Sequence, residues 1–197
     1  MYLKKFILGG LENNLYLLIE EETKEAILID AGEEPEEILD FLEKRKIKLK
    51  YLLLTHGHYD HTVGYKKIQE QTKAKILIHK EDVNISFGTK VTPDAYLIDG
   101  DEINVGSITL KVLHTPGHTQ GCCCFYFEKE KMLFSGDTLF YQGIGRTDLP
   151  EGNYDQELTS IKEKLLILPP ETIVYPGHGP ETNIEQAKTY LNETIFM

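Results

Sequence analysis

The sequence has no tryptophan and only three cysteines, which are the consecutive residues Cys122, Cys123 and Cys124. Neighbouring cysteines cannot join distant parts of a chain, so a disulfide-stapled scaffold is excluded. Free cysteine packs as a small apolar residue, and we therefore expect these three residues in a buried strand. A redox role, or ligation of a metal by Cys122, is the less favoured interpretation.

Basic residues are scarce, since 21 Lys and Arg stand against 32 Asp and Glu, which gives a formal net charge of −11. Proteins that bind polyanions normally carry a basic stripe that neutralises phosphates. The densest basic cluster lies at 44–50, after an acidic helix start, where cations suit the helix dipole. We therefore expect no nucleic-acid partner.

Long apolar runs are also missing, and none approaches the roughly 20 residues that a membrane span requires. The N-terminal residues 1–10 read as a strand interrupted by Lys4 and Lys5, without the apolar core and cleavage site of a signal peptide. The sequence thus predicts a cytoplasmic protein with no membrane partner. The oligomeric state is left open between a monomer and a small homo-oligomer.

The length of 197 residues suits one domain over 1–197. Apolar patterns and turn residues predict four helices, the first beginning at Pro35 and the others at Val63–Gln71, Gln156–Leu166 and Ile184–Asn192. The predicted strands are Leu3–Leu8, Leu15–Glu20, Ala26–Ile29, Tyr51–Leu54, Lys75–Ile78, Ile108–Leu113, Cys122–Phe127, Met132–Phe134 and Thr172–Tyr175. A similar run of strands in each half favours two face-to-face sheets with helices outside, although other α/β arrangements share this pattern.

The strongest chemical signal is the segment 55–61, where His56, His58, Asp60 and His61 directly follow an apolar strand. Histidine nitrogen and aspartate oxygen bind zinc at about 2.0–2.2 Å. On an extended loop His56 and His58 point the same way, whereas Asp60 and His61 lie beyond the turn. The segment therefore predicts two metal sites, with a surface histidine cluster as the alternative.

Three later segments each end an apolar strand in a tight turn with glycine before a ligand-type residue, namely His118, Asp137 or His178. Glycine suits close approach of the backbone to a bound group. Each turn is commonplace by itself. Together with the segment 55–61, the three turns make a specific pattern.

The order His-x-His-x-Asp-His, Thr-Pro-Gly-His-Thr, Ser-Gly-Asp-Thr and Pro-Gly-His-Gly resembles the metallo-β-lactamase superfamily from Asp30 to the end of the chain. The segment Gly-Arg-Thr-Asp-Leu-Pro at 145–150 is similar to small bacterial glyoxalase II-like proteins in particular. The resemblance implies a four-layer αββα sandwich with the site at one edge of its sheets. It also implies two divalent metal ions, zinc above all, with iron or manganese as alternatives.

The resemblance further implies how the metals are shared. Metal one would be held by His56, His58 and His118, metal two by Asp60, His61 and His178, and Asp137 would bridge them. His79 and His114 match no ligand position. Asp30 would support a ligand through a hydrogen bond.

Two such cations lower the pKa of a shared water, so hydroxide positioned by Asp60 and Asp137 would be the nucleophile. A cysteine-like thiol, with a pKa of about 8.5, leaves a thioester without a strong general acid. No Gly-x-Ser-x-Gly motif is present. The leading hypothesis is hydrolysis of a small hydroxyacyl thioester such as S-lactoylglutathione.

One departure concerns the substrate, because glyoxalase II enzymes typically add a basic helical region for glutathione, and here the sequence ends about one helix after His178. Tyr141 and Arg146 are candidate substrate contacts. Arg146 could pair with a substrate carboxylate, or form a structural salt bridge with Asp148.

The main alternative is a mononuclear iron persulfide dioxygenase, which the resemblance would place on His56, His118 and Asp137. A phosphodiesterase is less favoured because the chain is acidic. A lactonase or β-lactamase is less favoured because the sequence shows no specific pocket residue for it. Metal content would discriminate between the two leading chemistries.

Overall fold

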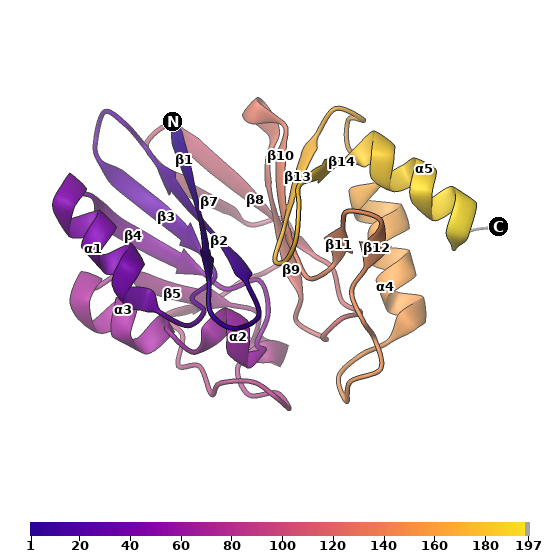
Figure 1. Ribbon diagram of the computed structural model, residues 1–197, viewed down its shortest axis with the longest axis horizontal. Coiled ribbons are helices and arrows are strands. Elements are labelled where there is room, and N and C mark those ends of the chain that lie inside the picture. The colour runs from indigo at the N-terminus through magenta and orange to yellow at the C-terminus, as the bar shows by residue number, and fades with distance from the viewer. Residues whose placement is uncertain (196–197) are drawn as a thin grey trace.

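Two six-stranded β-sheets pack face to face, and helices cover the outer face of each (Figure 1). The computed structural model describes residues 1–195, so the last two residues of the predicted domain 1–197 lie outside it. This arrangement confirms the predicted αββα sandwich. None of the helices within residues 1–195 is long and apolar enough to cross a membrane.

The first sheet has the strand order β1-β2-β3-β4-β5-β6 and carries the N-terminal half of the chain. Its strands are β1 Tyr2–Leu8, β2 Asn13–Ile19, β3 Glu25–Ile29, β4 Lys48–Leu53, β5 Lys75–Ile78 and β6 Ala95–Tyr96. The helices of this half are α1 Pro35–Arg45, α2 Tyr59–Thr62 and α3 Tyr65–Thr72, with a 3-10 turn η1 at Lys80–Asp82. Because the chain crosses over between them, β3 to β6 run parallel.

The second sheet has the order β14-β13-β10-β9-β8-β7. Its strands are β7 Glu102–Val105, β8 Ile108–His114, β9 Cys123–Phe127, β10 Met132–Gly136, β13 Ile173–Pro176 and β14 Thr182–Asn183. A separate hairpin joins β11 Leu139–Phe140 to β12 Gly143–Ile144. The helices are α4 Tyr154–Ser160, which continues as a π-helical turn η3 at Ile161–Leu165, and α5 Ile184–Thr194, with a 3-10 turn η2 at Glu128–Glu130.

The core has three layers because the central strands are apolar on both faces. In β2, Leu15 and Leu17 pack toward the helices of the first half, whereas Tyr16 packs between the sheets. In β9, Phe125 faces the first sheet and Tyr126 faces the C-terminal helices. Burial on both sides explains why these strands read as continuous apolar runs.

Several predicted boundaries lie one or more residues from the observed ones. The helix expected at Val63–Gln71 begins two residues later, at Tyr65, because Gly64 separates it from α2: the N–H of Gly64 donates to Ala31 O, and a side chain there would clash with the backbone of Gly32. The helix expected at Gln156–Leu166 begins earlier, because the side chain of Asn153 caps α4. The strand expected from Cys122 begins one residue later.

The strands that carry the predicted ligands end at one edge of the sandwich. β3 and β4 are a parallel pair in the first sheet, and β10 and β13 are a parallel pair in the second. Parallel neighbours end on the same side of a sheet, so the loops after them meet. The sequence segments that bear ligand-type residues are therefore brought together from both halves of the chain.

Candidate metal centre

The first ligand loop leaves the end of β4 and enters the one-turn helix α2. His56 is completely buried in this loop, and His58 stands at the N-terminus of α2. Asp60 and His61 occupy the helix itself, which turns them toward a different point. The loop thus contributes to two neighbouring clusters, as the spacing predicted.

The turns from the second sheet approach so closely that glycine is required. A Cβ on Gly177 would lie 2.2 Å from Asp137 Oδ1 and 2.7 Å from the His61 ring. Gly136, directly before Asp137, has a φ of 49°, which L side chains rarely adopt. These two glycines let β10 and β13 deliver their ligand-type residues to one place.

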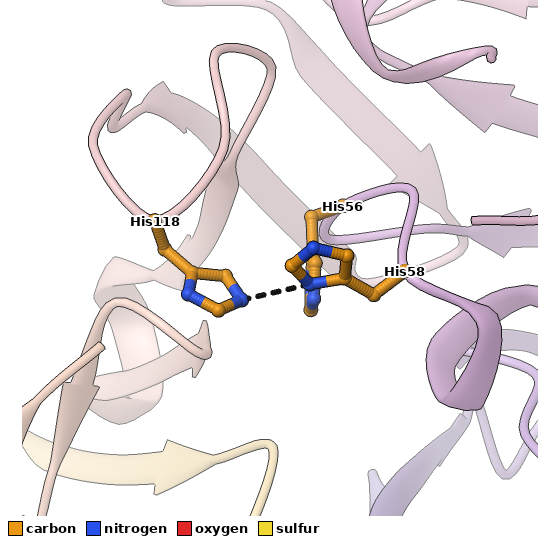
Figure 2. A group of neighbouring side chains, drawn as sticks. All are labelled: His56, His58 and His118. Carbon is orange, nitrogen blue, oxygen red and sulfur yellow. Dashed lines mark hydrogen bonds between the residues drawn. The ribbon is translucent and has the colours of Figure 1, made fainter. Parts of the chain in front are cut away.

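All seven predicted ligand residues converge, in three overlapping groups whose ligand atoms lie within 4.8 Å of one another. Figure 2 shows the rings of the first group turned toward one another from two separate segments. The groups are His56, His58 and His118; His56, His61 and Asp137; and Asp60, His61 and His178. The first and third groups coincide with the two ligand sets that the resemblance implied.

Four of the histidines have one ring nitrogen bound behind the cluster. His118 Nδ1 lies 2.8 Å from the carbonyl oxygen of Arg146, and His178 Nδ1 lies 3.0 Å from that of Leu11. His61 Nδ1 lies 2.9 Å from Asp30 Oδ2. His56 Nδ1 lies 3.0 Å from Thr55 Oγ1, whose own proton goes to Asp30.

These acceptors hold a proton on Nδ1, so Nε2 is the nitrogen that each of the four rings directs toward the centre. His118 Nε2 faces His58 Nδ1 at 2.9 Å, and His61 Nε2 faces His178 Nε2 at 3.3 Å. His56 Nε2 and Asp137 Oδ1 are buried without a hydrogen-bond partner. Converging lone pairs of this kind fit bound cations.

Asp137 lies between the two ligand sets. Its Oδ2 is 3.8 Å from His118 Nε2 in the first set and 3.6 Å from His178 Nε2 in the second. Its Oδ1 is 3.4 Å from His61 Nε2. This position fits the bridging role that the resemblance implied for Asp137.

Four of the ionisable groups, His56, His58, Asp60 and Asp137, are in the states that metal binding needs. Burial lowers the pKa of His56 well below its usual value and that of His58 to about 4, so both rings are neutral at pH 7. Burial would raise the pKa of Asp60, but His178 and His61 outweigh it and lower the value. The pKa of Asp137 is lowered likewise, because His61 outweighs burial. Neutral imidazole and ionised carboxylate are the ligand forms.

Carboxylates also lie beside the rings of His61 and His178. Burial lowers the pKa of His61, but Asp137 and Asp30 outweigh it and raise the value. The pKa of His178 is raised in the same way, chiefly by its bond to Asp60. The protons that these carboxylates stabilise on the two imidazoles are what a divalent cation would replace, and metal uptake should therefore release protons.

Asp30 supports the centre from the end of β3, as the resemblance implied. Its Oδ1 accepts the N–H of Thr55 at 2.7 Å, and its Oδ2 accepts the hydroxyl of Thr55 at 2.9 Å. Together with its bond to His61, this carboxylate orients rings of both ligand sets. Its backbone has a φ of 64°, which Asp tolerates better than most residues.

Asp82 is a support that the sequence did not reveal. This fully buried carboxylate accepts the N–H of Gly57 at 2.8 Å, the hydroxyl of Thr119 at 2.6 Å and the N–H of Gly121 at 2.6 Å. It therefore ties the loop of His56 and His58 to the loop of His118. Burial raises its pKa. Nothing in the polar segment 79–84 marks this aspartate among its neighbours.

Glu157 of α4 is a second buried carboxylate that sequence reasoning missed. Its Oε2 accepts the N–H of His118 at 2.9 Å, and burial raises its pKa to about 8. Its place on the apolar side of a helix was a usable signal, since glutamate is rarely buried without a partner. The loop that carries His118 is thus anchored to α4.

The other two histidines and the cysteines lie outside the three groups. His79 and His114 stack on each other with ring centroids 4.1 Å apart. Cys122, Cys123 and Cys124 are free and buried, and burial raises their pKa values, which suppresses thiolate chemistry.

A cavity of about 680 Å³ opens above the centre, with Asp60, Asp137, His58, His118 and His178 in its wall. Around them the cavity is lined by Leu11, Tyr59, Phe87, Gly88, Arg146 and Leu149. The volume is sufficient for a small organic substrate.

The two predicted substrate contacts differ in position. Arg146 lines the cavity and also forms a two-bond ion pair with Asp148, at 2.8 Å for each bond. Tyr141 is not brought to the centre, because the β11–β12 hairpin turns at this residue and directs it to a separate cavity beside α5.

The comparison with protein families gives one assignment. The model of the metallo-beta-lactamase superfamily matches residues 8–178, a span that contains every ligand-type residue of the centre. The chain belongs to this superfamily, whose members bind divalent metals. This confirms the resemblance seen in the motifs.

Two curated relatives are similar over most of their length. A probable metallo-hydrolase, YqgX, of Bacillus subtilis is 36% identical over 195 residues, which is 92% of each chain. The hydroxyacylglutathione hydrolase GloC of Haemophilus influenzae is 36% identical over 186 residues, 87% of this chain and 88% of the relative. These relatives support a hydrolase in general.

Solved structures carry several different names. The BLEG-1 B3 metallo-beta-lactamase superimposes with a TM-score of 0.87 at 33% identity over 99% of both chains. ETHE1 from Myxococcus xanthus superimposes with a TM-score of 0.86 at 31% identity, over 96% of this chain and 83% of its own. TTHA1623 in a di-iron-bound form superimposes with a TM-score of 0.84 at 32% identity, over 98% of this chain and 100% of its own. The fold is therefore shared by proteins with different names.

Proposed function

We propose that the protein is a thioesterase of the glyoxalase II type that cleaves a hydroxyacyl thioester such as S-lactoylglutathione. The observation that carries the proposal is the pair of ligand sets that share Asp137 beneath an open cavity. The similarity to hydroxyacylglutathione hydrolase GloC supports the thioester. Zinc is the first candidate for both sites, with iron and manganese as alternatives, because the same ligands suit all three.

Metals bound by these two sets would activate a water and polarise the thioester carbonyl. The residues of the chain provide the rest of the chemistry. Asp60 and Asp137 are ionised and face the cavity, where they orient the attacking water through its protons. The thiolate that leaves is stable in water, so no strong acid is required beside it.

The proposal is tested by elemental analysis followed by an assay of the metal-loaded protein with S-lactoylglutathione. We expect two metals per chain and release of glutathione. His58→Ala is the comparison variant, because His58 belongs to the first ligand set alone. Thioesterase activity that does not exceed that of His58→Ala would overturn the proposal.

A persulfide dioxygenase is the second candidate, favoured by the similarity to ETHE1 from Myxococcus xanthus. It would hold one iron on His56, His118 and Asp137, a set of two histidines and one carboxylate. A measurement of one iron per chain, together with oxygen uptake on glutathione persulfide, would support the dioxygenase and contradict the thioesterase proposal.

A further inference from the structure

The mouth of the cavity is formed by large apolar side chains that water reaches. Leu11 is 66% exposed, Phe87 is 68% exposed and Tyr59 is 49% exposed. They come from three separate segments: the turn between β1 and β2, the start of α2 and the loop between η1 and β6. Scattered apolar residues are common on surfaces, but apolar side chains that ring a binding cavity mark a contact for a ligand.

Phe87 is held in this place by its backbone. Its φ is 56°, a left-handed conformation that is unfavourable for a bulky residue. The carbonyl of Phe87 accepts the N–H of Tyr59 at 2.9 Å, and Gly88 pairs with His58 in an isolated bridge. An exposed aromatic ring on a strained backbone beside a candidate active site is the kind of strain that function retains.

Charge at the mouth points away from acidic ligands. Among the residues that line this cavity, Arg146 is the sole lysine or arginine, and both of its hydrogen bonds to Asp148 are already made. The whole chain has a net charge of −11. A ligand with several carboxylates would therefore find no unpaired lysine or arginine side chain in this wall.

We propose that the cleft selects thioesters whose thiol portion is apolar and uncharged, with Phe87, Leu11 and Tyr59 packed against that portion. This inference rests on the proposed thioesterase activity. A hydroxyacyl group is short and polar and is held at the floor beside the reacting carbonyl, so the thiol portion is the part that reaches the mouth. Asp148 then contributes to selection by keeping Arg146 from substrate carboxylates.

The test compares two substrates with the same acyl group, S-lactoylglutathione and the S-lactoyl thioester of benzyl mercaptan. We expect kcat/KM to be at least about ten-fold higher for the benzyl thioester, the scale of discrimination by an apolar pocket. Phe87→Ser should lower kcat/KM for the benzyl thioester about ten-fold, mainly by raising KM. The matched control is Ile167→Ser, at an isoleucine that is 72% exposed and does not line this cavity.

Asp148→Asn provides the opposite change. With Arg146 released, the ratio of kcat/KM values should move several-fold toward S-lactoylglutathione. A higher kcat/KM for S-lactoylglutathione in the unaltered protein, with Phe87→Ser equal to Ile167→Ser, would overturn the inference while leaving the thioesterase proposal intact.

Direct binding separates the two proposals if neither thioester is cleaved. The probes are the thioethers benzyl 2-hydroxypropyl sulfide and S-(2-hydroxypropyl)glutathione, in which a CH₂ group replaces the carbonyl. Tighter binding of the benzyl thioether, weakened by Phe87→Ser, supports the apolar mouth even though the thioesterase proposal has failed. Equal or tighter binding of the glutathione thioether overturns the inference that the mouth selects an apolar thiol portion.

Discussion

Five of the seven histidines converge and two stack apart, and the contrast shows what distinguishes a metal centre from a contact between imidazoles. In the centre, four rings donate Nδ1–H to an acceptor behind them and present Nε2 to their neighbours. In the outlying pair, the planes of His79 and His114 are 14° from parallel. Their nitrogens bond outward, His114 Nε2 to Gln120 O and His79 Nδ1 to Glu81 N. Proximity is common to both arrangements, and the direction of the lone pairs is not.

Removal of Asp137 should have the largest effect, because this carboxylate lies beside both ligand sets. We expect Asp137→Ala to lower the affinity for both metals by more than the ~100-fold that changes behind a ligand produce. Hydrolase activity should fall to background. Elemental analysis after dialysis measures this, and His79→Ala, in the outlying pair, should keep its full metal content. Two tightly bound metals in Asp137→Ala would contradict the bridging position.

Single histidine changes should separate the two ligand sets. His58→Ala should lose the metal of the first set and His178→Ala the metal of the second, because each ring belongs to one set. Each variant should retain about half of the metal, measured by titration with a colorimetric chelator. Loss of all metal from both variants would show that the sets do not fill independently.

The carboxylates behind the rings should have intermediate effects of about 10–100-fold on metal affinity. Asp82→Asn should weaken the first set alone, since Asp82 ties together the loops of His58 and His118. Asp30→Asn should weaken both sets. Asp94→Asn is the matched control, because Asp94 accepts the N–H of Ile76 away from the centre. If Asp82→Asn binds both metals as Asp94→Asn does, then Asp82 has no role in positioning.

The outlying pair should show the smallest effect, in stability and not in metal content. Burial and the neighbouring His114 lower the pKa of His79 to about 4, with smaller effects from Glu81 and Lys80. A histidine whose pKa is lowered on folding loses stability as the pH falls from about 6.5 through 4. Because the ring is partly exposed, we expect about 1 kcal/mol.

Urea unfolding of the metal-free protein at pH 7 and pH 4.5 measures this effect. His79→Gln should unfold with a smaller pH dependence than the unaltered protein. An unchanged dependence would show that the stacked pair does not titrate with folding.

The sequence predicted which residues converge at the candidate centre because each lies in a short segment where local chemistry is informative. A glycine before Asp137 or His178 marks a close turn in the sequence itself, and β9 shows its double burial as an unbroken apolar run. The supports depend on contacts between distant segments. Asp82 meets Thr119, 37 residues away, only after both sheets have packed. Phe87 and Leu11 belong to no motif in the sequence, and their place beside the cavity likewise depends on contacts between distant segments.

Local patterns also failed where packing overrides periodicity. The helix expected from Val63 begins only at Tyr65, because the backbone of Gly32 lies against Gly64. The turn η3 widens the last part of the helix that begins with α4, and the apolar spacing there does not distinguish an α-helical from a π-helical turn.

The centre lies at the seam of the sandwich, and each ligand set draws on both of its halves. His56 and His58 come from the first sheet and His118 from the second, while Asp60 and His61 meet His178 in the same way. A cation bound at this point would link the two sheets at one end of the sandwich. Metal loading should then stabilise the folded chain according to free metal and affinity. After chelation, amide hydrogen exchange should become faster first in the loops that carry the ligand-type residues.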